Sequence, residues 1–235
     1  MKLVFIRHAD PDYEHNTLTE KGFLEAEALG KMYSSKDFDE VYSSTLPRAY
    51  LTCDAVIKGE KKVNMCDWLV EFGHPVVVDG NKQIPWDFKP DYFIKHDLSS
   101  YDYLDFEPLK SGEIKKYYDE VIGELDKVLE KHGYIRDGKN YKVVKESNET
   151  IVFFCHFGIM SVLMSHLMNI PFTIITHYFV CLPSGVTKFI SEEREKGIAY
   201  FRMNNFSDIS HLKKAGLEPS FAGRFCEVYS SPDRH

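Results

Sequence analysis

The sequence lacks any long hydrophobic run and any excess of basic charge. Its first apolar stretch, residues 3–6, ends at Arg7, whereas a secretory signal needs about seven apolar residues and a membrane span roughly 18. The chain carries 29 Lys and Arg against 36 Asp and Glu, a formal net charge of −7. Because nucleic-acid binding requires a basic face, this balance argues against such a partner. We therefore expect neither a membrane nor a nucleic-acid partner.

Cysteine is scarce, and its spacing suggests no pairing. The five cysteines are an odd number, with no close pair and no CxxC motif. In a chain without a signal sequence they indicate reduced thiols and a cytoplasmic protein. No Cys or His spacing suggests a zinc site, so no metal is expected. The cysteines are Cys53, Cys66, Cys155, Cys181 and Cys226.

The overall composition is that of an ordinary globular protein. Hydrophobic residues make up 43% of the chain and charged residues 28%, which excludes disorder as the default state. The 235 residues fit one large domain, so we expect a single domain over residues 1–235. The net charge does not exclude a small basic pocket, and acidic small molecules remain possible ligands.

Short apolar segments alternate with amphipathic ones along much of the chain. Such alternation is typical of βαβ units and a mostly parallel sheet. The expected fold class is α/β, a three-layer α/β/α sandwich around that sheet. Strands are expected at 3–6, 40–43, 63–66 and 150–155, helices at 20–33 (capped by Thr19), 46–57 and 158–168, and a late hairpin at 185–191 and 198–203.

The alternation breaks in residues 74–112, which are rich in proline and aromatic residues, and a helix is expected after them at 113–132. Long ordered insertions are often lids or binding loops. We therefore expect residues 74–135 to form an inserted, aromatic-rich cap or lid within the domain. Its aromatic side chains either build a small core of their own or contact a substrate.

Two arginines and two histidines occupy equivalent places after strands. Arg7 and His8 follow the first strand, His156 follows the strand at 150–155, and Arg48 opens the helix after the second strand. In open α/β sheets ligands bind at the carboxyl ends of strands, so these side chains would face one crevice. Each of these features taken alone has a simpler interpretation. Arg7 and His8 could form a surface turn, His156 could be a hydrogen-bonded core histidine, and Arg48 could form a salt bridge at the start of its helix. Their shared position favours a pocket for phosphate or carboxylate.

Four segments, in this order, resemble motifs of the histidine phosphatase superfamily (phosphoglycerate mutase-like). Arg7-His8 with LTEKG at 18–22 resembles the RHG…LTxxG opening, and SSTLPRA at 43–49 resembles SSPLxRAxxTA. LVEFG at 69–73 resembles the stretch that supplies the acid, and VFFCHFG at 152–158 resembles the strand that ends in the second histidine. The resemblance implies the same α/β fold and phosphoryl-transfer chemistry.

The resemblance also implies a role for each matched residue. His8 would be the nucleophile that forms a phosphohistidine, and Glu71 the general acid and base. Arg7, Arg48 and His156 would hold the phosphoryl oxygens and neutralise their charge, so neither a metal nor a cofactor is implied. Without the resemblance, Glu71 would be interpreted as a solvated loop carboxylate.

The chain departs from the family pattern around both histidines. Ala9 and Asp10 replace the glycine and the Glu or Gln that usually follow the first histidine, and Phe157 replaces the glycine after the second. Asp10 would repel a phosphate dianion unless it turns away or pairs with an arginine. Phe157 would either pack in a lid or contact the substrate. Asn16 and Thr17 are the candidates for a further polar phosphate ligand.

We therefore expect a histidine acid-type phosphatase, a metal-independent phosphomonoester hydrolase acting on a small phosphorylated metabolite. The alternatives are a phosphoglycerate-mutase-type phosphotransferase and a non-enzymatic phospholigand-binding domain. The insertion is aromatic and mixed in charge rather than a basic clamp, which favours the hydrolase over the mutase. Binding alone needs neither a nucleophile nor an acid, which argues against the third class. The sequence implies no particular oligomeric state.

Overall fold

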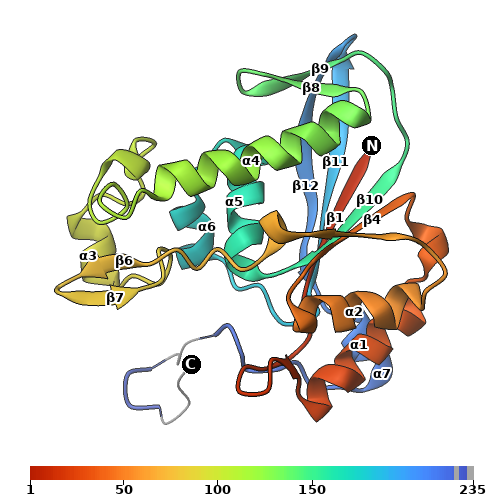
Figure 1. Ribbon diagram of the computed structural model, residues 1–235, viewed down its shortest axis with the longest axis horizontal. Coiled ribbons are helices and arrows are strands. Elements are labelled where there is room, and N and C mark those ends of the chain that lie inside the picture. The colour runs from red at the N-terminus through yellow and green to blue at the C-terminus, as the bar shows by residue number, and fades with distance from the viewer. Residues whose placement is uncertain (225–227, 232–235) are drawn as a thin grey trace.

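A mixed sheet runs through the middle of the molecule in the computed structural model, which describes residues 1–224 and 228–231 (Figure 1). Within these residues the sheet has eight strands in the order β5-β4-β10-β1-β11-β12-β9-β8. The first four of this order are parallel and are the strands expected from the apolar runs. They are β5 (Val63–Cys66), β4 (Glu40–Ser44), β10 (Thr150–Cys155) and β1 (Lys2–Arg7).

The other half of the sheet is antiparallel. β11 (Val186–Glu195) pairs with β1 on one side and with β12 (Ile198–Asp208) on the other. β11 and β12 form the expected late hairpin, and each strand continues beyond its predicted carboxyl end. A second hairpin, β8 (Tyr134–Asp137) and β9 (Asn140–Val143), continues the sheet beyond β12. This hairpin was not predicted, because each of its strands buries a single side chain and shows little apolar alternation.

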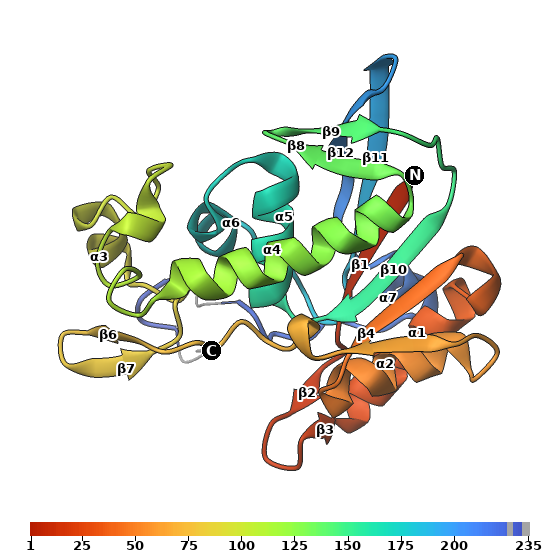
Figure 2. The same cartoon turned by 45° about the horizontal axis from the view of Figure 1, so that its top comes forward.

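Helices cover both faces of the sheet, which confirms the predicted three-layer sandwich (Figures 1 and 2). One face is covered by α4 (Ile114–Lys131), α5 (Phe157–Met168) and α6 (Phe172–Tyr178). The other is covered by α1 (Glu20–Met32), α2 (Pro47–Ile57) and α7 (Ser210–Ala215).

The sequence of β1 shows how the two layers are held on the sheet. Leu3 and Phe5 pack into the core shared with α4 and α5, whereas Val4 and Ile6 pack into the core shared with α1 and α2. A strand with apolar side chains on both faces has to be covered on both faces. Thr19 caps α1 as predicted, since its hydroxyl accepts a hydrogen bond from the Gly22 N–H at 2.9 Å.

The inserted segment lies beside the start of α4, away from the sheet (Figure 1). Several of its aromatic side chains, including Phe88, Phe93 and Tyr103, are buried in the core that they share with α5 and α6. Trp86 remains partly exposed at the margin of that core. The elements of the segment are β6 (Val76–Val78), β7 (Asn81–Gln83), α3 (Pro90–Lys95) and the 3-10 turn Tyr103–Asp105.

None of the helices in the described ranges has the length and apolar character needed to span a bilayer. The thiols of Cys53, Cys66, Cys155 and Cys181 are free, and Cys226 lies outside the described residues.

Candidate active site

The side chains singled out at the strand ends come together at the carboxyl ends of β1, β10 and β4. Arg7 and Cys155 are paired in the parallel register of β1 and β10, which places His8 beside His156. The two imidazole rings lie 5.0 Å apart, centre to centre. Arg48, in the first turn of α2, follows β4 at the same edge of the sheet.

His8 is held as a neutral imidazole with a defined tautomer. Its Nδ1 lies 2.8 Å from the carbonyl oxygen of Ala9, and because a carbonyl only accepts, Nδ1 carries the hydrogen. Nε2 therefore carries the free lone pair. The side chain is only 1% exposed, and this burial, together with the charge of Arg7, holds the pKa of His8 well below its ordinary value.

His156 is fully buried and is oriented by Ser44. Its Nε2 lies 2.9 Å from the Ser44 hydroxyl, which also accepts the Leu46 N–H at 3.2 Å. Because a hydroxyl can donate one hydrogen bond and accept two, this contact fits an imidazole hydrogen on either Nε2 or Nδ1. In the described part of the chain this Nδ1 has no hydrogen-bond partner. Burial, followed by the charges of Arg48 and Arg7, keeps the pKa of His156 well below its ordinary value.

Arg7 and Arg48 are two buried cations with unused donors. Arg7 donates through Nη1 to the carbonyl oxygen of Cys181, and the Arg48 guanidinium lies 5.4 Å from the centre of the Tyr13 ring. The Nε atoms of both arginines are buried and lack a partner among the described residues. Buried charges of one sign are costly unless an opposite charge joins them, so this arrangement favours an anion.

Glu71 lies at the amino end of α5. Its Oε1 accepts the N–H groups of Phe72 at 2.9 Å and of Ile159 at 3.2 Å. Burial raises the pKa of Glu71, and the charges of Arg7 and Arg48 act in the opposite direction. A Cβ at Gly158 would lie 2.5 Å from Oε1, so the close approach of this carboxylate to α5 requires glycine there.

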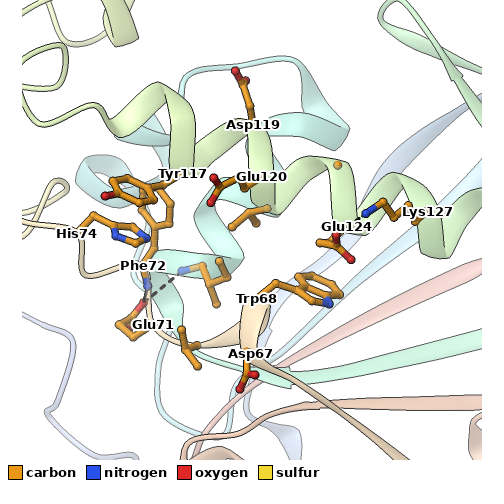
Figure 3. Close-up of a pocket in the computed structure, with 14 residues that line it drawn as sticks. Asp67, Trp68, Glu71, Phe72, His74, Tyr117, Asp119, Glu120, Glu124 and Lys127 are labelled. Atoms are coloured by element: carbon orange, nitrogen blue, oxygen red, sulfur yellow. Dashed lines mark hydrogen bonds and ion pairs between the residues drawn. The ribbon is translucent and has the colours of Figure 1, made fainter.

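A cavity of about 660 Å³ adjoins Glu71, between the segment 67–74 and α4 (Figure 3). Trp68 and Tyr117 line it, with His74 stacked on Tyr117 at 3.5 Å between ring centres. Its lining is strongly acidic and therefore disfavours a phosphate group. The acidic residues of the cavity are Asp67, Glu71, Asp119, Glu120 and Glu124.

The described chain holds no group of three or more His, Cys, Asp or Glu side chains suited to a metal ion.

The C-terminal strap, residues 220–224, passes close to the histidine pocket. The Ser220 hydroxyl donates to the Asp10 carboxylate, which also accepts the Thr19 hydroxyl at 2.7 Å. A Cβ at Gly223 would lie 2.4 Å from Nη1 of Arg7, so the strap backbone comes against this guanidinium. Asp10 thus has partners in the strap and at the start of α1, which explains how a carboxylate is accommodated next to His8.

The remaining predicted residues are distributed differently. Asn16 lies exposed at the tip of the hairpin formed by β2 (Pro11–Asp12) and β3 (Thr17–Leu18), and Thr17 pairs with Asp12 in that hairpin. No described hydrogen bond joins either residue to Arg7, Arg48 or the histidines. The aromatic residue that the same hairpin places near Arg48 is Tyr13.

Phe157 lies in the first turn of α5 and packs edge-to-face with Trp86, the ring centres being 6.5 Å apart. Tyr13, Ser44 and Trp86 were not predicted as site residues. Ser44 lies within the segment 43–49 that carries Arg48, so its motif was visible in the sequence. Tyr13 and Trp86 reach the site from loops, and no local pattern marks them.

Solved structures of similar fold include three phosphatases. A mutant of phosphoserine phosphatase from Entamoeba histolytica in complex with phosphoserine has a TM-score of 0.59 and 21% identity, over 90% of this chain and 98% of that one. Mycobacterial glucosyl-3-phosphoglycerate phosphatase with VO3 has a TM-score of 0.55 and 17% identity, over 88% and 98%. Alpha-ribazole phosphatase from Shigella flexneri has a TM-score of 0.54 and 17% identity, over 89% and 97%.

No curated protein matches the chain. Residues 3–203, by contrast, match the sequence model of the histidine phosphatase superfamily (branch 1). This match spans most of the chain and includes Arg7, His8, Arg48, Glu71 and His156. With the shared fold, it shows that the chain belongs to the histidine phosphatase superfamily.

Proposed function

We propose that this protein is a phosphomonoester hydrolase that works through a phosphohistidine at His8 and acts on a small phosphorylated metabolite. The observation that carries the proposal is the pairing of a neutral histidine, with a free lone pair on Nε2, and buried cationic donors that lack partners in the described chain. A nucleophile and an anion site in the same pocket are the two requirements of phosphoryl transfer to a side chain.

In the first step the Nε2 lone pair of His8 forms a bond to phosphorus while the bond from phosphorus to the ester oxygen breaks. The Nδ1–H of His8 donates to the Ala9 carbonyl oxygen throughout. Arg7, Arg48 and the Nδ1–H of His156 hold the phosphoryl oxygens and offset their charge. Glu71 gives its proton to the departing oxygen. Its Oε1 already accepts two N–H groups, so the proton is carried by Oε2.

In the second step water attacks phosphorus and the bond to Nε2 breaks. The Glu71 carboxylate accepts a proton from that water, so the protonated acid is regenerated and inorganic phosphate is released. His8 returns to its neutral state. The buried arginines supply the positive charge at the phosphoryl group, and we propose that the reaction needs no metal ion.

Two further considerations support a hydrolase. The names of similar structures include phosphoserine, glucosyl-3-phosphoglycerate and alpha-ribazole phosphatases, all of them enzymes of phosphorylated small molecules. A protein that merely binds a phospholigand has no use for a buried carboxyl with a raised pKa beside a histidine with a lowered one.

The proposal is tested with purified protein and an aryl phosphate in the presence of EDTA. We expect phosphate release, and an acid-labile phosphoenzyme after rapid quenching. His8→Ala is expected to lower kcat by roughly 10³-fold or more, because the nucleophile is lost. Full activity of this variant would exclude the mechanism.

A second assay separates hydrolysis from mutase activity. The protein is incubated with 3-phosphoglycerate and a trace of 2,3-bisphosphoglycerate. Formation of 2-phosphoglycerate without free phosphate would replace the hydrolase proposal with a mutase.

A further inference from the structure

The indole of Trp86 lies beside the proposed general acid. Trp86 donates from Nε1 to the carbonyl oxygen of Phe72 at 2.9 Å, and Phe72 is the residue that follows Glu71. The position that a Cβ of Gly158 would take lies 2.6 Å from this Nε1 and 2.5 Å from Oε1 of Glu71. The edge of the indole and the carboxylate therefore flank the same point at the start of α5.

A second ring continues this surface toward the histidines. Phe157 directly follows His156 and packs at 78° against Trp86. Trp86 and Phe157 thus form an aromatic pair that extends from the second histidine to the acid. An acid that protonates the departing oxygen must lie within hydrogen-bond reach of it. The organic part of a substrate therefore begins next to Glu71, and so next to this pair.

Trp86 differs from the other aromatic residues of the insertion in its surroundings. Phe88, Phe93 and Tyr103 are buried in the core, whereas Trp86 is only partly buried and is tethered through its N–H. The tether fixes the orientation of the indole while leaving part of its surface accessible. A fixed aromatic surface of this kind suits a flat or apolar binding partner.

The charges around the site point to the same class of ligand. The cations that most strongly affect the pKa values of His8, His156 and Glu71 are Arg7 and Arg48. Both are required for the phosphoryl oxygens. The cavity that adjoins Glu71 has an acidic lining, which would repel a carboxylate on the leaving group. An uncharged ring would instead have the aromatic surface of Trp86 to contact.

From this geometry we propose that Trp86 is a specificity-determining residue, and that the preferred substrates are phosphomonoesters whose uncharged leaving group carries a flat ring close to the ester oxygen. The inference rests on the proposed hydrolase function, because Glu71 is taken as the acid that meets the departing oxygen. Because Trp86 belongs to the insertion, this proposal assigns substrate selection to that segment of the chain.

The first test uses fluorescence, because the chain contains two tryptophans, Trp68 and Trp86. Trp68 lines the acidic cavity, so Trp68→Phe reports on the indole of Trp86 alone, and Trp86→Phe reports on the cavity. Both are made in a His8→Ala background to prevent turnover. Phenyl phosphate is expected to change the emission of Trp86 more than inorganic phosphate does. A change confined to Trp68 would assign the organic group to the cavity and overturn the proposal.

The second test compares two substrates, phenyl phosphate and glycerol 3-phosphate, in the protein with His8 intact. Trp86→Ala is expected to lower kcat/KM for phenyl phosphate by about tenfold more than for glycerol 3-phosphate, and Trp86→Phe to restore most of the loss. Tyr101→Ala is the matched control, because Tyr101 is an exposed aromatic residue of the same insertion. Equal losses on both substrates would contradict the proposal.

The two tests also separate this inference from the proposed function. Absence of a phosphoenzyme and of phosphate release would refute the hydrolase. In that case the fluorescence of the Trp68→Phe protein still reports whether an aryl phosphate reaches Trp86.

Discussion

The two histidines of the site differ in which ring nitrogen has a partner. His8 donates its Nδ1–H to the Ala9 carbonyl oxygen, which leaves the lone pair on Nε2. His156 places Nε2 against the Ser44 hydroxyl, and its Nδ1 has no partner in the described chain. In the proposed mechanism, one backbone carbonyl and one hydroxyl therefore set the different roles of the two rings.

The raised pKa of Glu71 predicts the direction of the pH dependence. The proposed first step needs Glu71 in its protonated form, so activity should fall as the pH rises through this pKa. On the acid side, the pKa of His8 lies well below its ordinary value, so the nucleophile stays unprotonated at mildly acidic pH. Glu71→Gln should remove the alkaline decline from the profile of log kcat against pH.

The same variant should respond to the leaving group. For an alkyl phosphate, whose alkoxide is a poor leaving group, Glu71→Gln is expected to lower kcat by roughly 10²–10⁴-fold. For an aryl phosphate with an acidic phenol the loss should be much smaller. Equal losses across a series of leaving groups would show that Glu71 does not donate the proton.

At the scale of elements, α5 brings together His156, Glu71 and the aromatic pair of Trp86 and Phe157. Its first turn follows His156, its Ile159 N–H binds Glu71, and Gly158 leaves the space in which Glu71 and Trp86 lie. A short helix start therefore fixes the relative positions of groups that come from three separate segments of the chain.

Replacing Gly158 with alanine should disturb this arrangement. The added Cβ would meet Glu71 Oε1 at 2.5 Å and Trp86 Nε1 at 2.6 Å, so we expect a fall in kcat of about tenfold or more, by displacement of the acid. Gly123→Ala in α4 is the matched control, because nothing lies within 4 Å of its Cβ position. It should keep full activity and gain up to about 1 kcal/mol in stability, as measured by urea unfolding.

An element could be predicted from the sequence when many of its side chains were apolar and buried. β1 and β10 bury nearly every side chain and were visible as apolar runs. β8 and β9 bury one side chain each and were missed. The site residues likewise divide into those that local sequence motifs predict and those that they do not. Arg7, His8, Arg48, Glu71 and His156 stand in local motifs and do converge, whereas Trp86 and the strap reach the pocket through tertiary contacts that no local pattern encodes.

At the scale of the whole molecule, one buried carboxyl links three distant segments. Glu25 of α1 is fully buried, and its Oε2 accepts the Asp10 N–H at 3.0 Å, while Asp10 in turn binds Ser220. Burial raises the pKa of Glu25 to about 7. The hydrogen bond from the Asp10 N–H and the charge of Lys21 oppose this shift, and the Asp10 carboxylate adds to it. The folded state therefore favours the protonated acid.

This predicts a stability that depends on pH. In the unfolded chain Glu25 ionises near its ordinary pKa, so the contribution of Glu25 to the free energy of unfolding should fall as the pH rises from about 4.5 to about 7 and level off above that. The loss should reach about 3 kcal/mol. Glu25→Gln should remove it, so the difference between the two proteins in urea unfolding should grow from pH 5 to pH 8. A constant difference would count against this assignment.

The strap has a consequence for the timing of turnover. His8 is only 1% exposed and the strap backbone lies against Arg7, so we expect atoms around the pocket to move aside when a phosphate ester enters and when phosphate leaves. Each turnover of the proposed reaction would then contain one opening for arrival and another for departure. When such movement is slower than the bond-breaking steps, kcat follows the viscosity of the solvent rather than the acidity of the alcohol released.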